Sequence, residues 1–556
     1  MKNTFAIRVL FFYALLLATY AWIGDGPSSI IHLIKRLYVY HGIPKTAFYV
    51  LAYLGAIAGL SVLYMSRNRF VRYSSYVISF FSIGLYLGYK RVNGYGYTFY
   101  DAKMAVSVYG LPYTDESIQT FLPYCIWPVA IAVFFVLAVE VCHRKLLPKI
   151  GTYAVIVPIL AVIPVYAINV RTLGEISNFP AAYEVPILSL VAKYHDIPLG
   201  RRAEPYMEPS SDPFVKHIIF IIDESVRGDM LSTNGYPVDT TPYLKSIANE
   251  FINFGVACAS TNCSSTTHIV LETGIRIDQL PDKEYKTLSQ PNIFQYARQA
   301  GYRTYILDGP NSWGKPYEWI GENDLDSIDK YYYVRKDNAG IQNYEIDYKM
   351  IDLIDEIIQS QESSFIYVIK YGCHFNYENS YPHTDKIFAP TIKDVKEHSL
   401  EVILNSYYNA VIWSVDGFFK QLLPTLRGKN VLVVYTSDHG QSIEEYETLP
   451  ATHCVGKNPP CSQASVPVIL FPMDSKTSEI LGCFGDNLAG NHNRASQFQI
   501  FPTMLEIMGY DPSDILHYYG PTLFDKLQGD REFISGTLYG RGFFQKHLFK
   551  SPEESL

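Results

Sequence analysis

The sequence lacks the features that mark several simple classes of protein. It has no internal repeat and no low-complexity tract, and its 556 residues far exceed the length of a small disulfide-stapled protein. An excess of basic charge is also missing, because 46 Lys and Arg side chains stand against 54 Asp and Glu side chains, a net charge of −8. This balance argues against a nucleic-acid-binding protein with a basic surface. At roughly 150 residues per domain, the length predicts about three or four domain-sized units.

The charge is divided unevenly along the chain. Residues 1–200 carry 16 basic and 8 acidic side chains, a net charge of +8. Residues 201–556 carry 30 basic and 46 acidic side chains, a net charge of −16. The overall hydrophobic content of 48% is likewise an average of an apolar N-terminal part and an ordinary globular C-terminal part. The two parts are therefore interpreted separately.

The N-terminal part contains five apolar segments whose lengths are close to the roughly 20 residues that a helix needs to cross a bilayer. They are residues 5–23, 47–65, 74–89, 123–142 and 151–170. The first segment is not predicted to be a cleaved signal peptide, because no small-residue cleavage site follows it. The sequence therefore predicts a transmembrane domain of five helices over residues 1–170.

Short basic loops predict the orientation of these helices, because such loops stay in the cytoplasm. Basic residues precede the first segment and follow the second and fourth: Lys2, Arg8, Arg67, Arg69, Arg72, Arg144, Lys145 and Lys149. Five spans then place the N-terminus in the cytoplasm and the chain after residue 170 outside. Residues 28–40 form either an amphipathic helix on the outer leaflet or a simple connector. The proline-rich residues 171–214 are predicted to be an extended linker.

From residue 215 onward, apolar runs of strand length alternate with helical patterns. The runs are residues 217–224, 302–308, 363–370, 430–438 and 466–471, and the helical patterns include 345–360 and 400–424. Continuous β-branched runs separated by helices predict an α/β domain over residues 215–556, with a mostly parallel sheet covered on both faces. In such sheets, ligands bind at the carboxyl ends of the strands.

Acidic residues and a histidine end two of these runs. Asp223 and Glu224 end the first, and Asp438 and His439 end the fourth within the sequence Ser-Asp-His-Gly. An isolated Asp-His-Gly is more often a turn, but here both strand ends are expected at one edge of the sheet. Carboxylate and imidazole groups are suitable ligands for Zn²⁺ or a similar cation. The sequence therefore predicts a metal site at this edge.

A hydroxyl-rich segment, residues 258–274, is typical of a polar loop that enters a helix. Free backbone N–H groups at a helix start can hold a phosphate group. A hydroxyl group coordinated to a metal ion also becomes a nucleophile at neutral pH without an adjacent histidine. Taken alone, however, the segment favours an ordinary Ser/Thr helix cap.

Together, these motifs resemble the alkaline phosphatase/sulfatase superfamily. In particular, they resemble the membrane-bound lipid A and lipopolysaccharide phosphoethanolamine transferases, which include the mobilised colistin resistance enzymes. The shared order is the first strand with residues 224–242, the hydroxyl-rich segment and the Ser-Asp-His-Gly strand. The resemblance covers nearly the whole chain and implies a monomeric, multi-pass protein of the bacterial inner membrane with a sulfatase-like periplasmic domain.

The resemblance implies a metal site and a nucleophile. The implied ligands of one or two Zn²⁺ ions, with Mn²⁺ as the alternative ion, are Glu224, Ser264, Asp438 and His439. Ser264 is the implied nucleophile because it lies ten residues before Gly274, the spacing of nucleophiles in this superfamily. Thr261 is the alternative, since its Ser-Thr-Asn context is similar to the Ser-Thr-Ala of the transferases.

The resemblance also implies residues that contact the substrate. His374 and His453 would bind phosphoryl oxygens or a second metal ion and would protonate the leaving group. Asn311 and Lys315 resemble the residues that bind the substrate headgroup in the family. A satisfied histidine or a solvated lysine remains the alternative interpretation at each of these positions.

The implied reaction has two steps. Ser264 attacks phosphatidylethanolamine and releases diacylglycerol, and a sugar hydroxyl or sugar phosphate of lipid A, the lipopolysaccharide core or another periplasmic glycan then takes the phosphoethanolamine group. The membrane domain would hold the lipid donor. The alternatives are a phosphoglycerol transferase or a phosphodiester or sulfate-ester hydrolase on the same scaffold, and a non-catalytic lipid sensor. A sulfatase is disfavoured because no Cys-x-Pro-x-Arg is present.

Six of the eight cysteines fall in the part predicted to be exported to an oxidising compartment. They are Cys258, Cys263, Cys373, Cys454, Cys461 and Cys483. Disulfides are favoured over a Cys/His zinc site, because neither Cys-x-x-Cys nor a matching His pair is present. The predicted pair is Cys454 with Cys461, which flank a short Gly-Lys-Asn-Pro-Pro loop.

Overall fold

The computed structural model divides the chain into two compact units, with the main division between Ile197 and Pro198. This division lies inside the predicted linker and coincides with the change in net charge near residue 200. The described residues are single positions between 35 and 51, and 62–93, 96–98, 101–102, 126–145, 181–194, 201–312, 314, 316, 322–443, 452–539 and 543–550.

The described part of the N-terminal unit contains three long helices. They are α3 Arg69–Asn93, α6 Ile126–Lys145 and α8 Ala181–Tyr194. Helix α3 packs against both α6 and α8. The hydroxyl group of Tyr76 on α3 donates a hydrogen bond of 2.8 Å to Glu140 Oε2 on α6. A polar contact thus joins two helices whose surfaces are mainly apolar.

Two of the five predicted spans coincide with described helices. Helix α3 contains residues 74–89, and α6 covers most of 123–142. Among the residues that the structure describes, no helix is both long enough and apolar enough to cross a membrane. The predicted spans 5–23 and 151–170 lie outside the described residues, as do most of 47–65 and of the stretch 28–40.

The prediction of an extended linker over residues 171–214 is wrong for part of that range. Residues 181–194 form helix α8, which contains Pro186. The remainder of the helix consists mainly of good helix formers such as Ala, Leu and Glu, which outweigh the single proline. Proline frequency alone was therefore a poor guide to the conformation of this segment.

The C-terminal unit is built on a seven-stranded sheet. The strands, in their order across the sheet, are β2 Ile252–Cys258, β7 Ser465–Pro472, β6 Val431–Ser437, β1 His217–Asp223, β5 Ser364–Ile369, β3 Arg303–Asp308 and β4 Lys330–Tyr333. Strand β7 is antiparallel to both of its neighbours, and the other pairs are parallel. The predicted α/β fold with a mostly parallel sheet is confirmed.

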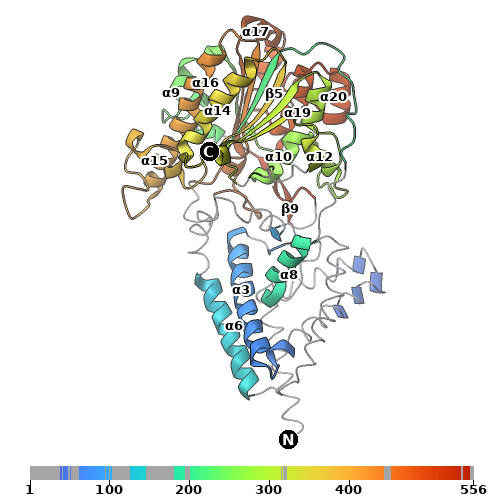
Figure 1. Ribbon diagram of the computed structural model, residues 1–556, viewed down its shortest axis with the longest axis vertical. Helices are drawn as coiled ribbons and strands as arrows, with labels where there is room; N and C mark the ends of the chain where they lie inside the picture. The colour runs from blue at the N-terminus through green and yellow to red at the C-terminus, as the bar shows by residue number, and fades with distance from the viewer. Residues whose placement is uncertain are drawn as a thin grey trace. The chain divides into compact units, whose positions relative to one another are not determined.

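Helices cover both faces of this sheet (Figure 1). One face carries α9 Pro242–Ser246, α14 Asn343–Ile358, α15 Leu400–Val411 and α16 Phe418–Leu426, and the other carries α10 Ser264–Thr273, α11 Ile293–Gln299, α19 Ile500–Ile507 and α20 Pro512–Tyr519. Along β1, Ile219 and Ile221 pack into one core, and Ile218 and Phe220 pack into the other. The strand is hydrophobic throughout because both faces are buried.

Smaller elements complete the unit. These are α12 Glu322–Leu325, α13 Val334–Asp337, α17 Ser475–Gly482, α18 Gly485–Gly490 and the antiparallel hairpin of β8 Arg531–Gly536 and β9 Phe544–Phe549. The five predicted strands all exist, with ends that differ by one residue or none. The predicted helix 400–424 is divided by a π-helical turn, Ile412–Gly417.

Strands β2 and β4 were not predicted from the sequence. In β2 the register shifts between Asn253 and Val256, because the strand contains a bulge at Gly255, whose φ is +68°. The polar Asn253 and the glycine obscure the apolar pattern. Strand β4 has only four residues, too few for a pattern to be distinguished.

A buried ion cluster lies at the carboxyl end of β5. Lys370 Nζ lies 2.6 Å from Asp223 Oδ2 and 3.8 Å from Asp347 Oδ2, and it also donates to the carbonyl oxygen of Ser414. The side chains of Lys370 and Asp223 are fully buried. Asp347 in turn accepts hydrogen bonds from the backbone N–H groups of Tyr371 and Gly372.

Replacing Lys370 by Met is expected to lower the free energy of unfolding by about 3–5 kcal/mol, because two buried carboxylates would lose their cation. Urea unfolding of the detergent-solubilised protein, followed by fluorescence, measures this effect. The control is Lys349→Met, which removes an exposed ion pair with Asp352 and should cost less than about 1 kcal/mol. Equal losses in the two variants would contradict the assignment.

Glu272 on α10 provides a pH-dependent contribution to stability. Its carboxyl group is buried, and burial raises its pKa to about 8, an effect that the Arg202 charge partly opposes. Since the unfolded carboxyl has a pKa near 4.5, the stabilising contribution is complete below that pH. It is lost as the pH rises through 8, because the unfolded chain gives up its proton first.

We therefore expect Glu272→Gln to lose less stability than the unmodified protein between pH 5 and pH 9. Unfolding midpoints measured across this range test the prediction. Glu479→Gln, which changes an exposed carboxyl on α17, should leave the original pH dependence in place. Parallel pH profiles for the Glu272 variant and the unmodified protein would contradict it.

Candidate functional site

The carboxyl ends of β1 and β6 lie side by side, and both carry predicted site residues. The parallel register pairs Asp223 with Ser437, so Glu224 and Asp438 follow immediately at the same edge. The backbone N–H of Asp438 donates to the carbonyl oxygen of Asp223 at 2.8 Å. The two strand ends are therefore held together by the sheet itself.

Glu224, Asp438 and His439 form a compact group. His439 Nε2 lies 3.6 Å from Glu224 Oε1 and 3.4 Å from Asp438 Oδ2. One candidate ligand atom from each of the three residues lies within 4.8 Å of the other two. The structure thus brings together three of the four residues predicted as metal ligands, and Ser264 is the fourth.

Ser264 is the first residue of α10 and lies against this group. Its Oγ is 3.2 Å from His439 Nε2 and 3.4 Å from Glu224 Oε2. The residue is partly exposed. The cap position belongs to Cys263, whose side chain makes no capping hydrogen bond. Ser264 is therefore not the ordinary helix cap that the segment alone suggested, and its hydroxyl lies among the candidate metal ligands.

Thr261, the alternative nucleophile, is held differently. It is fully buried, and its Oγ1 lies 2.7 Å from Thr266 Oγ1 and 2.8 Å from Thr267 Oγ1. The same hydroxyl donates to the carbonyl oxygen of Cys263 at 2.9 Å. Its contacts are those of a residue that fixes the loop before α10.

His374 and His453 lie beside the first group. Together with Glu224 they form a second set of candidate ligand atoms, again within 4.8 Å of one another. The ring centroid of His453 is 4.4 Å from that of His439 and 5.8 Å from that of His374. Glu224 is common to both sets. The structure therefore brings both predicted catalytic histidines, His374 and His453, to the edge of the sheet at which Ser264 lies.

The predicted headgroup residues remain predictions. Asn311 follows β3 and is fully buried. Its Nδ2 donates to Asp308 Oδ2 at 2.8 Å, and its Oδ1 accepts from the backbone N–H of Gly314 at 3.0 Å. These contacts shape the loop after β3. Lys315 lies outside the described residues.

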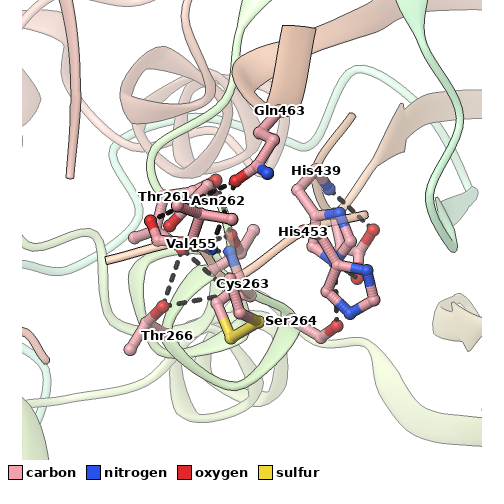
Figure 2. Close-up of a disulfide and its surroundings, with 12 residues drawn as sticks. Thr261, Asn262, Cys263, Ser264, Thr266, His439, His453, Val455 and Gln463 are labelled. Carbon is pink, nitrogen blue, oxygen red and sulfur yellow. Dashed lines mark hydrogen bonds and ion pairs between the residues drawn. A yellow bond between two sulfur atoms is a disulfide. The ribbon is translucent and has the colours of Figure 1, made fainter. Parts of the chain in front are cut away.

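The predicted disulfide Cys454–Cys461 is wrong. The structure joins Cys263 to Cys454, across 191 positions of sequence, and Cys461 is free. Figure 2 shows this disulfide next to Ser264 and His453. The short loop between Cys454 and Cys461 suggested a local pair, but the fold brings Cys263, at the start of α10, to a Cα–Cα distance of 4.7 Å from Cys454. Cys258, Cys373 and Cys483 are also free.

Burial favours the neutral imidazole form of two site histidines, His439 and His453. Burial lowers the pKa of His439, and burial together with the neighbouring His439 and His374 lowers the pKa of His453 well below its usual value. Burial and the Asp438 charge raise the pKa of Glu224. Burial also acts to raise the pKa of Asp438, but His439 and the Ser225 N–H outweigh it and hold that pKa below its usual value. Neutral imidazole is the form that binds metal ions.

The donor set fits a divalent cation. Asp438 Oδ2 is buried and makes no hydrogen bond, although it lies beside Glu224 and His439. A buried carboxylate oxygen without a hydrogen bond is costly unless a cation completes its environment. Two carboxylates, an imidazole and a serine oxygen are also typical ligands of Zn²⁺.

Two positioning residues were not recognised from the sequence. Ser225 has a φ of +61°, an unfavourable conformation for a serine. Its N–H donates to Asp438 Oδ1 at 3.0 Å, and its Oγ donates to Glu224 Oε1 at 2.6 Å. Gly372 has a φ of +60°, and a Cβ at this position would lie 2.4 Å from Asp223 Oδ1. A positive φ is strained for a serine but not for a glycine, and such strain clusters at functional sites. Dihedral angles are not visible in a sequence.

The fold and the site define a class of protein: an α/β domain with a partly exposed serine among candidate metal ligands at the carboxyl edge of its sheet. The sulfatase family model matches residues 216–510, which is more than half of the chain. The chain therefore belongs to the sulfatase family, in agreement with the resemblance to the alkaline phosphatase/sulfatase superfamily.

Relatives with curated functions match slightly less than half of the chain. The chain is 28% identical over 265 residues to the Kdo(2)-lipid A phosphoethanolamine 7''-transferase of Escherichia coli K12, and the match covers 46% of this chain and 44% of that protein. It is 29% identical over 266 residues to the protein of the same name from Salmonella typhimurium, with 46% and 44% covered. The match thus spans less than half the length of these relatives.

A solved structure resembles the chain over a longer range. The integral membrane lipooligosaccharide phosphoethanolamine transferase A of Neisseria meningitidis matches with a TM-score of 0.56 and 18% identity. The match covers 94% of this chain and 97% of that chain. At this identity the likeness concerns the fold, and it includes the N-terminal unit.

Proposed function

We propose that this protein transfers phosphoethanolamine from phosphatidylethanolamine to a lipid A-type or lipopolysaccharide acceptor through a covalent intermediate on Ser264. The observation that carries this proposal is the position of the Ser264 hydroxyl, 3.2 Å from His439 Nε2 and 3.4 Å from Glu224 Oε2 at the start of a helix. The names of the relatives support the transferred group and the acceptor class.

In the first step, the Ser264 Oγ–P bond forms and the bond between phosphorus and the diacylglycerol oxygen breaks. Glu224, Asp438, His439 and Ser264 would hold Zn²⁺, and the bound ion would lower the pKa of the serine hydroxyl and offset the phosphoryl charge. The N–H groups at the start of α10 would bind the phosphoryl oxygens. His374 and His453 bind phosphoryl oxygens, and one of them takes up the proton that Ser264 loses and delivers it to the departing diacylglycerol oxygen.

In the second step, an acceptor hydroxyl or phosphate attacks the phosphorus and the Ser264 Oγ–P bond breaks. The serine oxygen is now the leaving group, so the residues that assisted its attack in the first step assist its departure in the second. The two-unit organisation supports a protein of the inner membrane with a catalytic domain in the periplasm, the arrangement implied by the fold likeness to an integral membrane protein. Asn311 and Lys315 are assigned to the donor headgroup.

The proposal is tested with purified full-length protein in detergent and phosphatidylethanolamine labelled in its ethanolamine. We expect the intact-protein mass to increase by one phosphoethanolamine group, with release of diacylglycerol in equal amount, and the label to move to added lipid A. Release of free phosphoethanolamine to water in place of transfer would instead favour a phosphodiester hydrolase. A protein that gains no mass and releases no diacylglycerol would refute the covalent mechanism.

A further inference from the structure

The loop that carries His453 is not part of any helix or strand. Residues 452–460 lie between the end of the β6 segment and the short turn Cys461–Ala464. By contrast, His439 directly follows β6, and its Nδ1 contacts the carbonyl oxygen of Gly440 at 2.7 Å. His453 therefore depends on contacts outside its own loop for a fixed position, whereas His439 is positioned by the sheet.

On the N-terminal side of His453, the carbonyl oxygen of Thr452 accepts a hydrogen bond of 2.6 Å from the N–H of Ser442. On its C-terminal side, contacts come from the segment immediately before Ser264. The carbonyl oxygen of Asn262 accepts a hydrogen bond of 2.8 Å from the N–H of Cys454. Asn262 Nδ2 donates to the carbonyl oxygen of Val455 at 2.9 Å and to Gln463 Oε1 at 2.7 Å. Asn262 is fully buried. It thus binds the residues on the C-terminal side of His453.

The Cys263–Cys454 disulfide adds a covalent link at the same place. Cys263 precedes Ser264, and Cys454 follows His453, so the bond joins the neighbours of the two site residues (Figure 2). The Ser264 side has independent support, because Thr261 binds Thr266 and Thr267 and α10 packs in the core. Breaking the bond would therefore release the His453 side.

We propose that Cys263, Cys454 and Asn262 are positioning residues that hold His453 against Ser264, so that the Glu224–His374–His453 set is complete only in the oxidised protein. The Glu224–Asp438–His439 set is independent of the disulfide, because β1 and β6 position its members. This inference rests on the proposed function for its catalytic meaning. Two-electron reduction of the disulfide to two thiols, for example by dithiothreitol as it closes to its own cyclic disulfide, would separate the two sets.

The first test measures local structure in the metal-free, full-length protein by hydrogen exchange. In the double variant Cys263→Ser/Cys454→Ser, exchange of the amides of residues 452–456 should rise at least about 10-fold through local opening, while the amides of β6 keep their protection. Cys461→Ser/Cys483→Ser is the matched control, because it removes two unpaired thiols and should change neither region. Unchanged exchange at 452–456, or an equal rise throughout the sheet, would overturn the proposal.

Asn262→Asp keeps the disulfide but loses the two Nδ2 donor bonds. It should increase exchange at residues 452–456 in the same direction and by a smaller factor. Because this variant retains the covalent link, it also tests the proposal if the double cysteine variant fails to fold. Exchange at 452–456 no different from that of the unmodified protein would refute the role of Asn262.

The second test is a double-mutant cycle with zinc titration as its readout. Removing the disulfide should weaken binding of a second zinc ion, at the Glu224–His374–His453 set, about as much as His453→Ala does. Removing it from the His453→Ala variant should cause no further loss. Additive losses would mean that the disulfide acts on the fold in general and would overturn the proposal. Neither test measures phosphoethanolamine transfer. A protein in which the disulfide positions His453 but Ser264 forms no adduct would therefore refute the proposed function and leave this inference intact.

Discussion

Replacing Ser264 by Ala is expected to abolish phosphoethanolamine transfer, with a loss of at least about 10³-fold, as for the removal of other catalytic nucleophiles. The reason is geometric. The Ser264 hydroxyl lies 3.2 Å from His439 Nε2 and is partly exposed, whereas Thr261 is fully buried among other hydroxyls. Thr261→Ala should therefore retain most of the activity and lose some stability.

Mass spectrometry of cell-envelope glycolipids measures this difference in cells that produce the unmodified protein or one of the variants. Ser289→Ala, which removes an exposed serine hydroxyl, is the control and should leave all phosphoethanolamine-bearing species unchanged. Loss of these species in Thr261→Ala but not in Ser264→Ala would assign the nucleophile to Thr261. If none of the variants changed them, the transferase assignment would fail.

Replacing Asp438 by Asn is expected to weaken zinc binding by at least about 100-fold, more than the loss of an outer-shell partner usually costs. The substituted side chain has the same shape, and its Oδ1 can still accept from the N–H groups of Ser225 and His439. Only the buried oxygen that makes no hydrogen bond is replaced. The effect on metal binding should therefore not arise from a loss of fold.

Stability of the same variant should change in opposite directions with and without metal. Burial and the Asp438 charge raise the pKa of Glu224, because two neighbouring carboxylates repel each other in the absence of a cation. Without metal, Asp438→Asn should be at least as stable as the unmodified protein, and with excess Zn²⁺ it should be less stable, since bound ligand stabilises the folded state. Thermal unfolding with and without Zn²⁺ measures both values.

Asp352→Asn is the control for this pair of measurements, because it changes an exposed carboxylate on α14. It should bind Zn²⁺ like the unmodified protein. Equal zinc affinity of Asp438→Asn and Asp352→Asn would show that Asp438 is not a ligand. A large loss of stability in metal-free Asp438→Asn would show that its carboxylate serves the fold instead.

Local patterns were sufficient for much of the fold. The apolar runs that became β1, β3, β5, β6 and β7 are continuous and end at polar residues, so their positions were predicted within one residue. Strand β2 was not found because its bulge at Gly255 interrupts the pattern. The helix over residues 181–194 is not apparent from the sequence, because Pro186 lies inside it and proline is typical of an extended linker.

The candidate metal ligands could be predicted for a related reason. Glu224, Asp438 and His439 each follow a strand of a parallel sheet, and such a sheet places all its carboxyl ends at one edge. The order of the strands was not needed to expect them together. The disulfide could not be predicted in this way, because Cys263 and Cys454 are 191 positions apart and no local pattern links them.

The sequence by itself determined the α/β class, the division near residue 200, and the strand-end residues that make up the candidate metal site. These features depend on periodicity, composition and the topology common to parallel sheets. The tertiary structure alone decided which hydroxyl lies against His439, which cysteine pairs with Cys454, and which backbone groups hold His453. Such contacts join residues that are distant in sequence, and they are formed only when the packed fold brings those residues together.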